Sequence, residues 1–120
     1  MQINHLHLHV QDVAKSRAFY ERYFGLKLKF EIAKDFIFLT DDAGMDFALS
    51  VEKDPQPMPD WFHFGFRLPS ANQVRELHAR MKTDGTAVEE IAVYGDRITF
   101  AVPDPDGYGV EVYASNTEGG

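Results

Sequence analysis

The sequence predicts an α+β fold in which one βαβββ module occurs twice. Three observations favour this class. Segments that alternate apolar and polar residues, as strands do, are combined with two segments of helical spacing. A proline-rich stretch, 53–60, then interrupts both patterns near the middle of the chain. The same order of elements follows on either side of that stretch, which indicates an internal repeat.

Strands are expected wherever apolar residues recur at every second position. In the first half these segments are 3–10, 26–33, 36–40 and 45–51. In the second half they are 61–68, 88–93, 97–102 and 110–114. Within the second of these strands, the alternation predicts an inward-facing row of Leu26, Leu28, Phe30 and Ile32.

Each half also contains one helix with recognisable ends. Asp12 is a typical N-cap, and Gly25 follows the apolar residues of helical spacing as a typical stop. In the second half Ser70 and Gln73 form a capping box, and Gly85 ends the helix. Each half therefore reads as strand, helix and three strands.

The two halves align with one another at nearly constant offsets. His5 aligns with His63, 58 positions later, and the turn that contains Gly44 aligns with the turn that contains Gly107, 63 positions later. We therefore expect repeats at 1–52 and 61–115, joined by the linker 53–60 and followed by a disordered tail, 116–120. Equivalent residues of two such halves are expected to converge on a shared cavity.

Composition limits the possible functions. A chain of 120 residues is large enough to bury a core as one domain. It has no cysteine, which excludes disulfides and thiolate chemistry. The net charge of −7, without a basic stripe, argues against binding to nucleic acid. Because we find neither a secretory signal nor an apolar stretch of membrane-spanning length, we expect a soluble cytoplasmic protein.

A carboxylate stands between two valines in the last strand. Glu111 must be paired, protonated or bound to a cation if its surroundings are apolar, whereas simple alternation would leave it in solvent. The repeat adds His5 and His63 as equivalent residues of the two first strands. Two imidazoles and one carboxylate suit Fe²⁺, Mn²⁺, Zn²⁺, Ni²⁺ or Co²⁺. Ala48, the repeat partner of Glu111, supplies no ligand, so such a metal would keep open positions, as in a catalytic site.

Two motifs of the chain resemble those of the vicinal-oxygen-chelate superfamily, which includes glyoxalases, bleomycin-resistance proteins, fosfomycin-resistance proteins and extradiol dioxygenases. The opening motif is Asn4-His5-Leu6-His7-Leu8-His9-Val10-Gln11-Asp12-Val13, with Ser16, Phe19-Tyr20 and Phe24-Gly25-Leu26 after it. The closing motif is Phe100-x-x-Pro103-Asp104-Pro105-Asp106-Gly107-x-x-x-Glu111. The resemblance implies two βαβββ modules that form a cupped mixed sheet around a divalent metal. It also implies that His5, His63 and Glu111 are the metal ligands.

The resemblance does not select one reaction. The lactoylglutathione lyase branch has a further glutamate at the position of Ala48. Many ring-cleaving dioxygenases carry four modules, and this chain has two. The chain also lacks both an extended cationic loop and an arginine after Glu111, which fosfomycin modification would use to hold a phosphonate.

Further residues share the faces of these ligands. His7 is expected to carry a proton or donate a hydrogen bond to substrate, or else to be a polar wall residue. Because it lies two residues from His5 on one strand, the two imidazoles can also chelate one ion together, but we prefer His5 as the ligand. His9 is expected to be structural or exposed, and His78 to be a surface residue of the second helix.

Other polar side chains are also expected near Glu111. Arg67 shares the face of His63, and Tyr113 shares the face of Glu111, so both are candidate catalytic residues. Arg97 and Thr99 lie on the neighbouring strand, and an arginine there would bind a carboxylate or enolate. The alternative for both arginines is an ordinary surface ion pair. Tyr94 is expected in the turn before the strand of Arg97. Trp61 is expected either to cover the pocket as a lid or to anchor its strand.

These features predict a metal-dependent enzyme of the glyoxalase and dioxygenase type. In it a divalent metal would chelate neighbouring oxygens of a small substrate and stabilise an enolate or alkoxide, in lyase, isomerase, transferase or dioxygenase chemistry. The alternative is a dimeric binding protein of the bleomycin-resistance kind, which sequesters a cationic drug without chemistry. A homodimer is expected in either case, because open sheet edges tend to pair.

Overall fold

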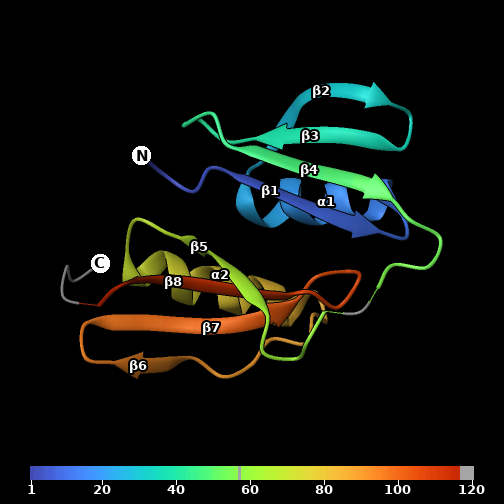
Figure 1. Ribbon diagram of the computed structural model, residues 1–120. Helices are drawn as coiled ribbons and strands as arrows, with labels where there is room; N and C mark the ends of the chain where they lie inside the picture. The colour runs from blue at the N-terminus through green and yellow to red at the C-terminus, as the bar shows by residue number, and fades with distance from the viewer. Residues whose placement is uncertain (57, 117–120) are drawn as a thin grey trace. The chain divides into compact units, whose positions relative to one another are not determined.

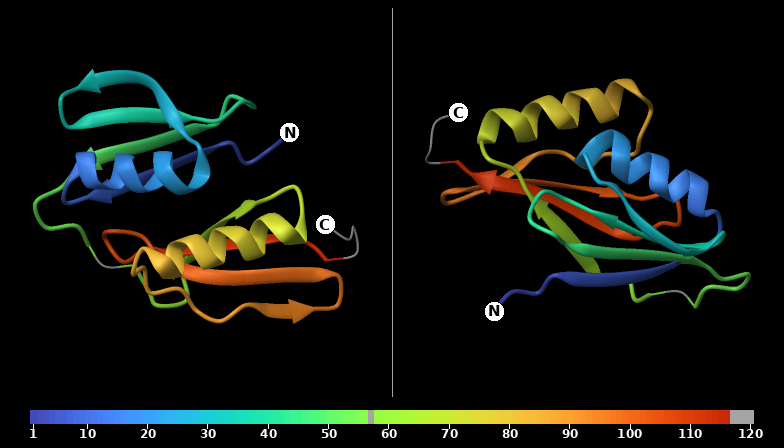
Figure 2. Two further views of the ribbon diagram at one scale, coloured as in Figure 1. Left: turned by 180° about the vertical axis from the view of Figure 1, so that it is seen from behind. Right: turned by 90° about the horizontal axis from the view of Figure 1, so that it is seen from above.

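Two units of matching topology make up the chain. The computed structural model describes residues 1–56 and 58–116, and the contacts divide the chain into Met1–Pro57 and Met58–Gly120. In each unit a helix lies across one face of a four-stranded mixed sheet (Figures 1 and 2). The expected tail lies outside the described residues except for Asn116. Among the described residues, no helix has the length and apolar character needed to cross a membrane.

The first unit follows the expected order. Its elements are β1 (His5–Val10), α1 (Val13–Phe24), β2 (Lys27–Ala33), β3 (Phe36–Thr40) and β4 (Asp46–Val51). The sheet order is β1-β4-β3-β2, with β1 parallel to β4 and the other neighbours antiparallel. Asp12 caps α1 by accepting a hydrogen bond from the amide of Lys15 at 3.1 Å, and Gly25 ends it with a φ of 66°.

The core of this unit lies between α1 and the sheet. Tyr20 of α1 and Phe47 of β4 are fully buried, and their rings lie 4.6 Å apart. Burial of each such side chain stabilises the fold by about 1.5–3 kcal/mol. The expected inward row of β2 is wrong in its second half, because Phe30 and Ile32 are 44% and 59% exposed. Irregular pairing of this edge strand with β3 breaks its alternation after Leu28.

The second unit repeats this arrangement. Its elements are β5 (His63–Arg67), α2 (Ala71–Thr83), β6 (Ala92–Tyr94), β7 (Arg97–Pro103) and β8 (Gly109–Ser115). The sheet order is β5-β8-β7-β6, with β5 parallel to β8. Ser70 caps α2 by accepting a hydrogen bond from the amide of Gln73 at 3.3 Å. Val74, Leu77 and Met81 of α2 are buried, as are the alternate residues of β7 and β8.

The strand expected at 88–93 is shorter than the alternation suggested. Only Ala92–Tyr94 pairs regularly with β7. Before it, Glu89 donates its amide to the Ala101 carbonyl at 2.9 Å, and its own carbonyl oxygen lies 2.9 Å from His78 Nε2. His78, which was expected to be a surface residue, is partly exposed but makes tertiary contacts. Its ring is half-buried, and it packs edge-on against Phe100 with centroids 4.9 Å apart. His78 thus ties α2 to the segment that precedes β6.

Candidate metal centre

Glu111 projects from β8 on the face of the second sheet that α2 does not cover. Its strand neighbours Val110 and Val112 are buried on the opposite face, and the Glu111 side chain is 21% exposed. The turn before β8 sets this orientation. Asp104, itself buried, accepts hydrogen bonds from the amides of Asp106 and Tyr108 at 2.9 Å each.

His63 of β5 lies beside this carboxylate. The distance from His63 Nε2 to Glu111 Oε2 is 3.3 Å, and His63 Nδ1 lies 3.0 Å from the carbonyl oxygen of Trp61. A carbonyl oxygen only accepts hydrogen bonds, so Nδ1 must carry the proton. In neutral His63 the lone pair of Nε2 then faces a carboxylate oxygen, and two acceptors at this distance require a cation between them. A proton on Nε2 or a bound metal ion meets that requirement.

The other oxygen of Glu111 has different partners. Thr99 Oγ1 donates a hydrogen bond to Oε1 at 3.1 Å, and the Arg97 guanidinium forms a hydrogen-bonded ion pair with the same atom. Burial raises the pKa of Glu111. The hydrogen bonds from Arg97 and Thr99, together with the charges of Arg97 and His63, outweigh that effect and hold the pKa below its usual value. Glu111 is therefore a carboxylate at neutral pH.

A glycine makes room for the carboxylate. Gly65 of β5 pairs with Glu111, and a Cβ atom built on it would lie 2.9 Å from the backbone oxygen of Glu111 and 3.3 Å from its Cβ. Gly65 was not among the residues predicted to belong to the site. The available signal was a glycine inside an alternating strand, which often marks the close approach of another chain segment.

A pocket of about 240 Å³ opens beside the carboxylate. Its polar lining includes Tyr94, Arg97, Thr99 and Glu111, with Glu89 and Glu90 also contributing. Tyr94 is the last residue of β6 and is 68% exposed. The pocket lies entirely in the second unit, so it places polar groups of β6, β7 and β8 beside Glu111.

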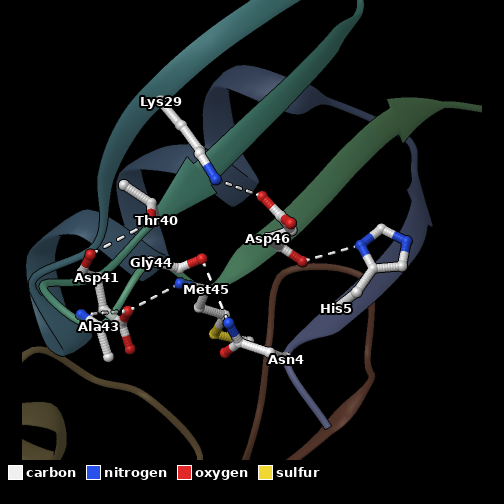
Figure 3. Close-up of polar contacts among 9 residues, drawn as sticks. All are labelled: Asn4, His5, Lys29, Thr40, Asp41, Ala43, Gly44, Met45 and Asp46. Atoms are coloured by element: carbon white, nitrogen blue, oxygen red, sulfur yellow. Dashed lines mark hydrogen bonds and ion pairs between the residues drawn. The ribbon is translucent and has the colours of Figure 1, made fainter. Parts of the chain in front are cut away.

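His5 repeats the geometry of His63 within the first unit. Its Nδ1 lies 3.1 Å from the carbonyl oxygen of Asp46, as Figure 3 shows, so this ring also carries its proton on Nδ1 and keeps the Nε2 lone pair available. Metal-bound histidines usually donate their second ring nitrogen to a carbonyl or carboxylate in this way. The Asp46 carboxylate is separately held by Lys29 at 2.6 Å (Figure 3).

The pairing registers of the two units repeat with the offsets found in the sequence. His5 pairs with Asp46 as His63 pairs with Gly109. One step along, His7 pairs with Ala48 and Gly65 pairs with Glu111. The pairs His7–Ala48 and Gly65–Glu111 each contain one large polar residue and one small residue. The large residue is on β1 in the first unit and on β8 in the second. His7 of β1 therefore lies beside Ala48 of β4. In the lactoylglutathione lyase pattern described above, a glutamate occupies the position of Ala48.

His7 has its own polar partner. Its Nε2 lies 2.8 Å from Ser50 Oγ, and its ring stacks on Phe36 with centroids 5.2 Å apart. Partial burial, together with the charges of His9 and His5, lowers the pKa of His7, so the neutral form predominates at pH 7. Ser50 was not identified from the sequence, because nothing in its local pattern distinguishes it from other serines.

The remaining candidates divide into two groups. Tyr113 belongs to the cluster around Glu111, since its ring lies under the Arg97 guanidinium with Cζ 3.9 Å from the centroid. Arg67 is exposed and pairs with Tyr113 across β5 and β8. Trp61 is 76% exposed and contributes its carbonyl to His63.

Within residues 1–56 and 58–116 no three His, Asp or Glu side chains gather as a metal-binding group. The combination of His5 with His63 and Glu111 therefore stays a prediction.

The donor set of the second unit fits a divalent metal. His63 Nε2 and Glu111 Oε2 are an imidazole and a carboxylate oxygen of the kind that first-row metals bind, and both are oriented by a second hydrogen bond or ion pair. Their separation of 3.3 Å is within the span of two ligands of one ion, which sit about 2.0–2.2 Å from zinc, for example.

Comparison with known proteins agrees with this fold. A probable trivalent organoarsenical cleaving enzyme of Bacillus subtilis is 32% identical over 98% of this chain and 84% of its own length. The structure of a possible glyoxalase from Bacillus cereus matches with a TM-score of 0.82 and 38% identity, covering 93% of this chain and 97% of that one. The fosfomycin resistance protein FosX from Listeria monocytogenes matches with a TM-score of 0.81 at 22% identity, covering 98% and 96%, and so shares the fold.

A family model extends the comparison over nearly the whole sequence. The model for the Glyoxalase/Bleomycin resistance protein/Dioxygenase superfamily matches residues 2–112, which include both motifs and all three expected ligands. With this match, similar proteins at 32% and 38% identity and the two βαβββ units in place, the chain belongs to the Glyoxalase/Bleomycin resistance protein/Dioxygenase superfamily.

Proposed function

We propose that this protein is a divalent-metal-dependent enzyme whose ligands are His63, Glu111 and His5. The observation that carries the proposal is the 3.3 Å approach of His63 Nε2 to Glu111 Oε2, with His63 Nδ1 held by a carbonyl. His5 is the proposed third ligand because its Nδ1 is held in the same way. A divalent metal is consistent with one protein of the same fold, because a FosX mutant was solved in complex with Mn(II) and 1S,2S-dihydroxypropylphosphonic acid.

A metal held by these residues would supply Lewis-acid chemistry toward neighbouring oxygens of a small substrate. The side chains of the protein have the other roles. His7 moves a proton, because its neutral imidazole is hydrogen-bonded to Ser50 and can accept one. Arg67, which is exposed on the face of His63, orients an anionic group of the substrate. Tyr113 supports the site through its contact with Arg97.

Lyase, isomerase, transferase and dioxygenase reactions remain within this proposal. The relative from Bacillus subtilis suggests bond cleavage, but its trivalent arsenical substrate does not transfer. Trivalent arsenic is a soft centre that prefers thiolate ligands, and this chain has no cysteine. We therefore propose a small oxygen-bearing substrate, acted on by a cytoplasmic homodimer. Light scattering of dilute protein tests the dimer, and a stable monomer would contradict it.

Metal analysis tests the proposed function directly. Protein purified without added metal, and the same protein after dialysis against Mn²⁺, Fe²⁺, Co²⁺, Ni²⁺ or Zn²⁺, should retain close to one ion per chain. His63→Ala, Glu111→Gln and His5→Ala should each reduce that content strongly, because each removes one ligand. Glu76→Gln, an exposed change of the same kind on α2, should have no effect.

The pattern of losses identifies the ligand set. Loss in the His63 and Glu111 variants with normal content in His5→Ala would replace His5 as the third ligand, and His7→Ala would then be the next variant to examine. Sub-stoichiometric metal in the unmodified protein, unchanged by all three substitutions, would contradict metal dependence. It would favour the metal-free binding protein, which calorimetry with bleomycin would then examine.

A further inference from the structure

The two oxygens of Glu111 have separate surroundings. Oε1 receives both the Thr99 hydroxyl and the Arg97 guanidinium. Oε2 faces His63 Nε2 at 3.3 Å, and neither Arg97 nor Thr99 donates a hydrogen bond to it. A carboxylate whose two oxygens differ in this way cannot exchange them by rotation without losing two hydrogen bonds.

Arg97 is itself held in place. Its Cζ lies 3.9 Å from the centroid of the Tyr113 ring, a cation–π contact from the adjacent strand. Thr99 pairs with the same tyrosine across β7 and β8. Arg97, Thr99 and Tyr113 therefore form one rigid group on neighbouring strands, and Glu111 Oε1 is the atom on which their donors converge.

We infer that Arg97 and Thr99 are positioning residues, which occupy Glu111 Oε1 so that only Oε2 is offered to the metal. This inference rests on the proposed function, since it concerns how the same site binds its ion. It limits Glu111 to a single ligating oxygen and leaves a larger share of the coordination sphere for substrate. It also gives Arg97 a role that differs from an ordinary surface ion pair.

Thr99→Val tests the hydrogen bond without any change of charge. Valine has nearly the shape of threonine and suits a strand, so the fold should be kept, but the donor to Oε1 is lost. Loss of such an outer partner typically weakens metal binding about 10–100-fold. For Thr99→Val we expect the affinity for Co²⁺ to fall by about 10-fold, the lower end of that range. Thr99→Ser, which restores the hydroxyl, should recover wild-type affinity, and Thr83→Val on α2 should leave it unchanged.

Arg97→Met tests the guanidinium by the geometry of the bound ion. Removing a cation beside the metal lowers electrostatic repulsion while releasing the carboxylate, so affinity alone does not separate the two effects. The visible absorption spectrum of the Co²⁺-loaded protein does, because it reports coordination directly. We expect this spectrum to change in Arg97→Met and in Thr99→Val, and to match the wild type in Thr99→Ser and Thr83→Val.

The outcomes separate this inference from the function on which it rests. Co²⁺ uptake by the wild type, with wild-type affinity and spectrum in both Thr99→Val and Arg97→Met, would overturn the positioning role alone. Failure of the wild type to take up Co²⁺ would overturn the metal site and the positioning role together. Matching amide NMR spectra of the metal-free proteins exclude misfolding as the cause of any difference.

Discussion

At the scale of single residues, Glu111 shows why a charge is tolerated between two buried valines. Its backbone continues the strand, while its side chain leaves by the face that α2 does not cover. There Arg97 and Thr99 compensate the charge, so burial does not force the group to become neutral. The same pairing fixes the orientation of the carboxylate that we propose as a metal ligand.

This pairing predicts a pH effect in the metal-free protein. Because the pKa of Glu111 is lowered in the folded state, its contribution to stability is present above the unfolded-state pKa and is lost as the pH falls through the folded-state value. Arg97→Gln removes the charge of Arg97 and its ion-paired hydrogen bond, which is the largest of the influences that lower this pKa, so the pKa of Glu111 should rise. Urea unfolding should then show a smaller loss of stability between neutral and acidic pH.

Carbon NMR titration of the Glu111 carboxyl carbon measures the same change directly. The control is Arg75→Gln on α2, whose arginine bonds Asn72 and Asn116 rather than Glu111. An identical Glu111 titration in wild type and Arg97→Gln would show that the ion pair does not govern this group.

Gly65 offers a second test at this scale. An added Cβ would lie 2.9 Å from the Glu111 backbone oxygen, which cannot move away without disturbing β8. Gly65→Ala should therefore lower the free energy of unfolding by about 1–3 kcal/mol, as overpacking commonly does. Urea denaturation measures this value, and an unchanged midpoint would mean that the two strands separate easily.

At the scale of elements, short polar contacts determine where helices and strands begin. Asp12 and Ser70 each accept an amide hydrogen bond at the first turn of a helix. Asp104 does the same for the turn before β8, with Gly107 at a φ of 88° completing it. The position of Glu111 along β8 depends on this turn, because the strand begins at Gly109.

Substitution of Asp104 should therefore weaken the whole second unit. Asp104→Ala leaves two amides without their acceptor, and we expect a loss of about 1–3 kcal/mol in the free energy of unfolding. Asp104→Asn keeps one acceptor oxygen and should lose less. Equal losses in the two variants, measured by urea unfolding, would show that the negative charge of Asp104 matters more than its hydrogen bonds.

At the scale of the whole molecule, duplication provides two histidines of the same geometry and one carboxylate. His5 and His63 both carry a proton on Nδ1, whereas Ala48 and Glu111 differ at the other repeated position. The two copies of the module therefore carry different side chains at this repeated position. The second unit has the carboxylate of Glu111, and the first unit has His7 beside the equivalent Ala48.

Metal binding should accordingly stabilise the folded protein. An ion that binds only the native state adds about 2.7 kcal/mol at a free concentration of 100 times its Kd. Calorimetry should show a higher Tm for the wild type in excess Mn²⁺, reversed by a chelator, and no increase for Glu111→Gln. An equal increase in both proteins would place the stabilising ion elsewhere.

Much of the architecture followed from the sequence, because periodicity and capping are local properties. Alternation located the strands, Asp12 and Ser70 marked the helix starts, and the repeat brought His63 and Glu111 to adjacent strands. Local pattern failed where a neighbouring segment decided the outcome. The exposure of Phe30 depends on the irregular pairing of an edge strand, and the contact of His78 depends on a carbonyl eleven residues away.

The sequence by itself determined the βαβββ repeat and which side chains are candidate ligands, since spacing and side-chain chemistry can be read from it directly. Only the tertiary structure decided which oxygen of Glu111 is available. Arg97 and Thr99 lie fourteen and twelve residues before Glu111, and no local rule states that both donors meet at Oε1. The physical reason is that strand pairing aligns β7 with β8, and this alignment of separate strands places two donors on one oxygen and an imidazole beside the other.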